Sequence, residues 1–79
     1  MKNLNTIKKA EVKEMMKGLI MKGERIIDVD IAENVIWVLT KTKHGVYWNY
    51  SIMKGSRRVY KNLPDMLHGE NRHYCDIVE

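Results

Sequence analysis

Three runs with strand character follow one another in the middle of the chain, separated by very short polar segments. They are rich in Val, Ile, Trp and Tyr and cover residues 25–31, 35–42 and 46–53. In the first run, Ile27, Val29 and Ile31 alternate with two Asp residues, as in a half-buried strand. The second run is apolar on both faces and should be central. Because hairpin turns fit such short gaps, the pattern predicts a three-stranded antiparallel meander.

The register of the middle strand has two solutions. With loops of three and then four residues, Trp37 and Leu39 face the same side as Val29 and Tyr50. With loops of two and then three residues, Val38 faces that side instead, and Trp37 joins an exposed apolar patch on the far face. We favour the first register, because burial of a Trp side chain stabilises a fold by a few kcal/mol.

An amphipathic helix is expected before the meander, at about residues 5–22. Its apolar side chains fall on one arc at 100° per residue, and they are Leu4, Val12, Met15, Met16, Leu19 and Ile20. Asn5 or Thr6 can cap the helix, and Gly23 can end it in the left-handed conformation. A row of lysines, spaced four residues apart, lies on the other side and consists of Lys9, Lys13 and Lys17.

The C-terminal part of the chain predicts smaller elements. Residues 57–61 suit a short fourth strand, residues 63–68 a helical turn that Asn62 can cap, and residues 72–78 a last strand. We therefore expect one α+β domain over residues 1–79. In it, an N-terminal amphipathic helix packs on a small antiparallel sheet, a three-stranded meander plus one or two short C-terminal strands, to give two layers.

Composition restricts the cellular setting. The only cysteine, Cys75, cannot form an internal disulfide, which favours a reducing compartment. The N-terminal residues are too charged for a signal peptide, and no apolar run approaches the length of a membrane span. We expect a cytoplasmic protein without membrane contact.

Catalytic and metal-binding signatures are weak. The spacing His68-x₄-His73-x-Cys75 matches no zinc pattern, and the two Asp residues of the first strand are expected to be solvated acids. No phosphate-binding glycine loop is present. We expect no enzyme activity, no cofactor and no metal, since an active site would need residues as distant as Asp28, His44 and His73 to meet.

Charge is distributed in blocks along the chain. Residues 41–61 contain six Lys or Arg and no Asp or Glu, whereas residues 23–40 contain one Arg and four acidic residues. The net charge of the whole chain is +4. Such blocks can become a positive and a negative face, and a positive face attracts polyanions or acidic protein surfaces.

The basic block supplies the candidate binding residues. They are Lys41, Lys43, Tyr47, Lys54, Arg57, Arg58 and Lys61, and the row Lys9, Lys13 and Lys17 could extend them. The first hypothesis is a small basic module that binds RNA or DNA mostly through backbone contacts, with Tyr47 stacking on a base. The alternative is an inhibitor or adaptor, of the type that phages and mobile elements encode, which binds an acidic or nucleic-acid-handling host protein. A thin core and a second apolar face would also suit a homodimer.

Overall fold

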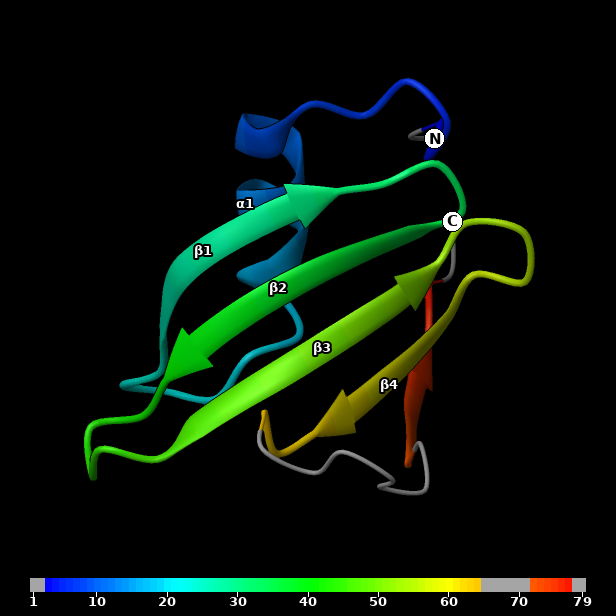
Figure 1. Ribbon diagram of the computed structural model, residues 1–79. Coiled ribbons are helices and arrows are strands. Elements are labelled where there is room, and N and C mark those ends of the chain that lie inside the picture. The colour runs from blue at the N-terminus through cyan, green and yellow to red at the C-terminus, as the bar shows by residue number, and fades with distance from the viewer. Residues whose placement is uncertain (1–2, 65–71, 78–79) are drawn as a thin grey trace.

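One helix and five strands make up the described part of the protein. The computed structural model describes residues 3–64 and 72–77 (Figure 1). The elements are α1 (Lys9–Met16), β1 (Arg25–Ile31), β2 (Val35–Lys41), β3 (Tyr47–Met53), β4 (Arg58–Asn62) and β5 (His73–Asp76). The strands form a single antiparallel sheet in the order β1-β2-β3-β4-β5, so each strand pairs with its neighbour in sequence. The predicted α+β fold class is confirmed.

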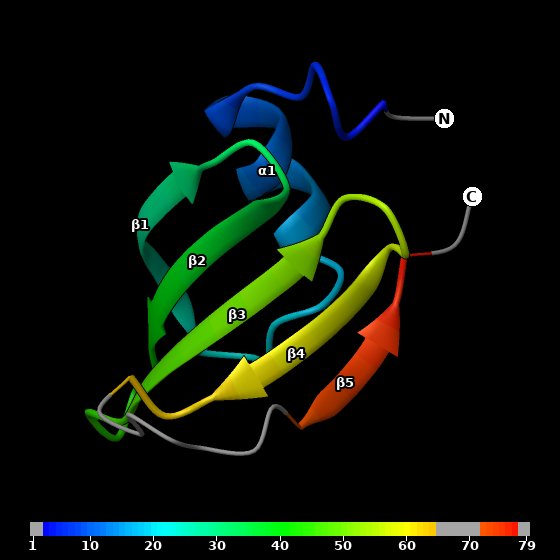
Figure 2. The ribbon, with the colours of Figure 1, turned by 45° about the vertical axis from the view of Figure 1, so that its right-hand side comes forward.

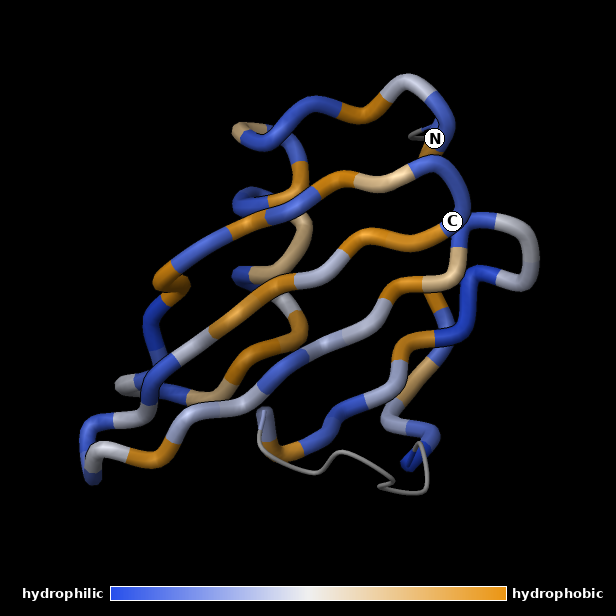
Figure 3. The backbone as a smooth tube through the Cα atoms, viewed as in Figure 1, coloured by the Kyte–Doolittle hydropathy of each residue, from blue (hydrophilic) through white to orange (hydrophobic). Residues whose placement is uncertain are grey.

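The helix lies across one face of the sheet, and Figure 2 shows it behind β2 and β3. The core between the two layers consists of Leu4, Ile7, Val12, Met16, Val29, Ile36, Val38, Tyr50, Ile52 and Val59. Every strand from β1 to β4 contributes to it, and the hairpin turns are mostly hydrophilic (Figure 3). We call the side of the sheet under α1 the covered face.

The helix is shorter than the predicted range of residues 5–22. The segment before it forms a separate turn, in which Thr6 donates its backbone N–H to the Asn3 carbonyl. The helix then starts after Lys8, whose backbone N–H donates to the Glu11 carboxylate at 3.2 Å. After Met16 the chain continues in tighter turns. Gly18 there costs about 1 kcal/mol relative to Ala in a helix, which explains part of the early end.

The register of β2 is the second of the two alternatives, so the preference for burying Trp37 was wrong. Trp37 lies on the face away from α1 and is 39% exposed, whereas Val38 is fully buried. The hydrogen bonds that close the hairpins run from Ala32 to Val35 and from Thr42 to Val46. These bonds leave loops of two and then three residues, and this length turns Val38 toward the helix.

A β-bulge changes the expected pattern of β1. The pairing with β2 shifts between Ile26 and Asp28, so that Ile26 packs against the core and Ile27 is 46% exposed. Ile27 was expected on the same face as Val29, and this was wrong. A bulge adds one unpaired residue to a strand. The side chains on one side of it therefore point to the opposite faces from those that regular alternation would give.

The C-terminal strands follow the predicted positions with small differences in their ends. β4 begins at Arg58 and β5 begins at His73, each one residue after its predicted start. Their connection begins with Leu63 and Pro64, and most of the predicted helical turn at 63–68 lies outside the described residues. The backbone of Arg57, just before β4, has a φ of 61°, which is in the left-handed region that glycine favours. Gly45 has the positive φ predicted for its hairpin turn.

A pair of substitutions tests the register of β2. Ile36→Ala should lower the free energy of unfolding by about 2–5 kcal/mol, because it leaves a cavity in the core. Trp37→Ala should cost less than half as much, because this side chain is already partly in water. Urea unfolding followed by far-UV circular dichroism measures both. A larger loss for Trp37→Ala would contradict this register.

Candidate functional site

The face of the sheet opposite α1 is uncovered by any element within residues 3–64 and 72–77. We call it the open face. Alternation along the paired strands assigns to it Arg25, Asp28, Asp30, Val35, Trp37, Leu39, Lys41, Tyr47, Asn49, Ser51, Met53, Arg58, Tyr60, Asn62, His73 and Asp76. A single exposed apolar residue is ordinary on a protein surface, but several aromatic residues on one flat face indicate a contact surface.

One row of side chains crosses the open face through all five strands. Direct pairing places Asp30, Trp37, Ser51, Tyr60 and His73 next to one another in that order. At the far end of the row, the Tyr60 and His73 rings meet edge to face, with centroids 6.0 Å apart. This contact holds the Tyr60 ring against His73. The row therefore offers two large aromatic side chains separated by a small hydroxyl.

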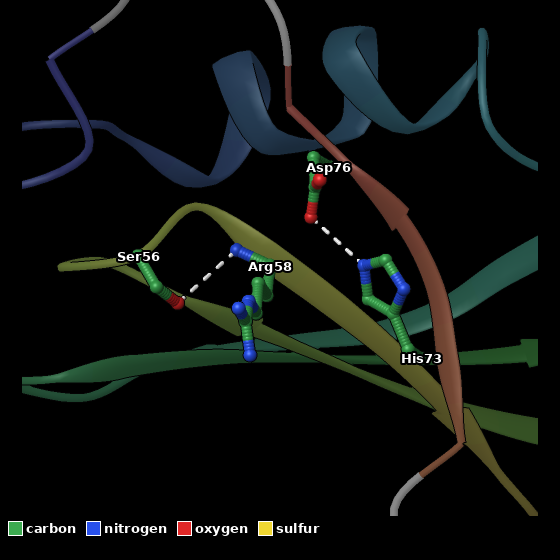
Figure 4. Close-up of polar contacts among 4 residues, drawn as sticks. All are labelled: Ser56, Arg58, His73 and Asp76. Carbon is green, nitrogen blue, oxygen red and sulfur yellow. Dashed lines mark hydrogen bonds and ion pairs between the residues drawn. The ribbon is translucent and has the colours of Figure 1, made fainter.

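Positive charges lie on both sides of this row. Lys41 places its ammonium 5.2 Å from the ring centroid of Tyr47, which is its direct partner across the hairpin. On the other side, Arg58 extends away from α1 (Figure 4). Asp76 pairs opposite Arg58 on β5, and its carboxylate contacts the His73 ring at 2.8 Å.

An apolar hollow of about 390 Å³ continues the open face beyond the aromatic row. Its lining consists of Leu39, Val46, Tyr47, Leu63 and Pro64. Leu63 and Tyr47 are both more than one third exposed. The hollow is suited to an apolar group of a ligand, such as a base or a hydrophobic side chain.

Lys61 is separated from the other predicted binding residues. Its ammonium lies on the covered side of β4, where the rings of Trp48, Tyr50 and Tyr74 surround it at 4.7, 5.3 and 5.0 Å from their centroids. At these distances each ring attracts the cation. The charge of Lys61 is thus used inside the fold rather than on the open face.

Glu24 is a buried carboxylate beside this aromatic group. Thr40 and Tyr50 donate hydroxyl hydrogen bonds to one of its oxygens, and the backbone N–H of Met21 donates to the other at 2.9 Å. Burial alone would raise the pKa of Glu24, but these bonds and the Lys61 charge outweigh it and lower the pKa below its ordinary value of 4.5. Burial and the contact with Glu24 raise the pKa of the Tyr50 hydroxyl, which keeps it a donor.

The cluster of Glu24, Thr40, Tyr50 and Lys61 has a structural role. A hollow of about 380 Å³ reaches Glu24, but both carboxylate oxygens already accept hydrogen bonds. The sequence pattern did not reveal the cluster. A signal was present, however, since Thr40, Tyr50 and Lys61 are polar or amphipathic residues at positions that face the core.

The remaining predicted binding residues are distributed over several surfaces. Lys9 and Lys13 are exposed on α1 and Lys17 is exposed directly after it, on the other side of the sheet from the open face. Lys17 contacts Glu14 at 3.0 Å, an exposed ion pair of the kind that contributes little to stability. Lys43 lies in the β2–β3 turn, while Lys54 and Arg57 lie at the opposite end of the sheet, next to the β3–β4 turn.

The residues considered for catalysis stay apart. Asp28 and His73 lie on the two opposite edge strands, and His44 lies in a hairpin turn. Burial, with a contribution from Asp76, raises the pKa of the Cys75 thiol, which disfavours the nucleophilic thiolate. Within the described ranges, no three His, Cys, Asp or Glu side chains gather closely enough to hold a metal ion.

The fold and the open face define a small two-layer α+β domain with an aromatic, partly basic sheet surface. Comparisons with protein-family models, with curated proteins and with solved structures found no match. In the part of the chain that the structure describes, no helix has the length and apolar character needed to cross a bilayer.

The buried carboxylate predicts a specific response to acid. Because the pKa of Glu24 is lowered by folding, its ionised form stabilises the protein above about pH 4.5, and this contribution disappears as the pH falls through the lower folded value. Glu24→Gln should lower the free energy of unfolding at pH 7 by about 1–3 kcal/mol. Chemical unfolding at several pH values should show the gap between the two proteins narrowing below pH 4.5. A gap that stays constant would argue against an ionised Glu24.

Proposed function

We propose that this protein is a small basic module, without enzymatic activity, that binds nucleic acid on its open face. The observation that carries the proposal is the combination on one uncovered sheet surface of two exposed aromatic rings, Trp37 and Tyr47, and the half-buried ring of Tyr60 with Lys41 and Arg58. Rings of this kind can contact bases or sugars, and cations beside them can contact phosphates.

Electrostatics supports the same function. The chain carries a net charge of +4, and such a charge favours encounter with a polyanion. Each cation that neutralises a phosphate releases a counterion, so binding of this kind weakens as salt rises. The basic surface and the lone Cys75 suit a reducing compartment that contains nucleic acid, and we assign the module to the cytoplasm.

The apolar hollow favours a second candidate function. A protein partner could insert a hydrophobic side chain between Leu39, Tyr47 and Leu63 and meet the flanking cations with acidic residues. The module would then act as an inhibitor or adaptor of a nucleic-acid-handling protein. In that case the purified protein would bind free nucleic acid weakly at every salt concentration.

Binding measurements separate these functions. Fluorescence anisotropy with labelled RNA and DNA, over about 50 to 200 mM salt, should show affinity that falls steadily as salt increases. An absence of salt-dependent binding to all of these nucleic acids would exclude the first function and favour the second.

Two charge-matched variants identify the surface that binds. Lys41→Glu with Arg58→Glu should weaken binding at least tenfold. It should also lower the number of counterions released on binding, which the salt dependence of the affinity measures, by about two. Lys9→Glu with Lys13→Glu changes the net charge equally but alters only α1, and should have a much smaller effect. Circular dichroism confirms that both variants are folded. A larger loss for the α1 variant would place the binding surface on the helix side instead.

A further inference from the structure

We infer that the ligand of the open face is a single strand, whose bases stack on Trp37 and Tyr60. This inference rests on the proposed function and adds the class of nucleic acid. Base stacking on aromatic side chains is the means by which proteins hold unpaired strands without strong sequence preference. In a duplex the faces of the bases are stacked on one another and cannot reach a flat protein surface unless they are extruded.

The geometry of the row fits successive or nearby bases. Trp37 on β2 and Tyr60 on β4 both pair directly with Ser51 on β3, so the two aromatic residues are two strand spacings apart, about 10 Å. The Trp37 side chain is 39% exposed. The Tyr60 ring is half-buried and meets the His73 ring at an interplanar angle of 66°, which restricts its rotation. Two rings at this spacing, one of them held by His73, can each stack on a base of the same strand.

Polar side chains between and beside the rings can contact base edges. Ser51 lies between Trp37 and Tyr60, and Asn49 lies in the next row of the open face, opposite Leu39. The neighbouring Asn62 is already engaged, because its side-chain oxygen accepts a hydrogen bond from the backbone N–H of Arg72. A hydroxyl can donate or accept, and an amide can do both at once. These groups give any base some hydrogen bonds, which suits tolerant rather than strict sequence recognition.

The cations are placed for phosphates on either side of the platform. Arg58 is two residues from Tyr60 on the same face of β4, about 7 Å along the strand. Lys41 is four residues from Trp37 on β2, about 13 Å in the other direction. A backbone that passes the aromatic row would meet positive charge before and after it.

The acidic residues of β1 limit where the strand can lie. Asp28 and Asp30 are on the open face at its β1 edge, directly opposite Leu39 and Trp37. Their charges repel phosphates, so the bound strand should pass over β2, β3 and β4 and avoid β1. At the opposite edge, Asp76 on β5 lies across from Arg58, so the cations Lys41 and Arg58 stand on the strands between two acidic edges. This contrast in charge across one face is what selects a polyanionic strand of limited width as the occupant.

The first experiment compares a 12-nucleotide single strand with the duplex of the same sequence by fluorescence anisotropy at about 100 mM salt. The single strand should bind the wild-type protein at least tenfold more tightly. Trp37→Ala and Tyr60→Ala should each weaken single-strand binding about 5- to 150-fold, in line with the stacking contribution per base. Trp37→Phe, which keeps a ring, should retain most of the affinity and shows that the loss follows from stacking.

Met21→Ala serves as the matched control, because Met21 is 62% exposed but lies outside the open face. It should leave binding unchanged. Equal affinity for duplex and single strand, together with full binding by Trp37→Ala, would overturn this inference while leaving the proposed function intact. No binding to either nucleic acid would overturn both. A wild-type dimer that Trp37→Ala converts to a monomer, with nucleic-acid affinity unchanged, would assign the open face to a second copy of the chain and also overturn the inference.

A second measurement uses the acidic edge. Asp28→Asn with Asp30→Asn should raise the affinity for the single strand severalfold, because it removes two negative charges from the edge of the open face. Glu11→Gln with Glu14→Gln makes the same change in charge on α1 and should raise the affinity for the single strand much less. An equal effect of the two pairs would contradict a strand bound across the open face.

Discussion

β2 has apolar side chains on both of its faces, and only one of these faces can pack under α1. The hairpin hydrogen bonds select the face that contains Ile36 and Val38, and the pairing register then carries this choice through the whole sheet. Once Val38 faces the helix, Trp37 must face solvent, because neighbouring residues of a strand point to opposite sides. The core and the candidate binding surface are therefore two results of one pairing register.

Much of the fold could be predicted from the sequence because it depends on local signals. The alternating runs, the turn at Gly45 and the amphipathic spacing around Val12 and Met16 act within a few residues. The face of Trp37 could not be predicted in this way, because a change of one residue in loop length reverses it. Likewise, the bulge at Ile26 depends on pairing with another strand, and it reversed the expected position of Ile27.

The basic residues illustrate a similar limit for the candidate site. Residues 41–61 form one positive run in the sequence, but the strands distribute its charges over different surfaces. Lys41 and Arg58 reach the open face, whereas Lys61 lies under β4 beside three aromatic rings. A count of charges cannot distinguish these positions, since alternation along each strand decides which face of the sheet a side chain points to. The buried Glu24 was missed for the same reason, because its partners come from β2 and β3.

The bulge in β1 has a consequence for assembly. β1 is an edge strand of the sheet, and its outer backbone groups are a potential template for another strand. A bulge bends such an edge and interrupts its regular row of donors and acceptors, and Asp28 and Asp30 beside it repel the same two side chains on the β1 edge of a second copy. At the opposite edge, β5 has only four residues and its pairing with β4 is also interrupted. Both edges of the sheet thus disfavour edge-to-edge pairing with a further strand, even though one broad face of the same sheet is left uncovered.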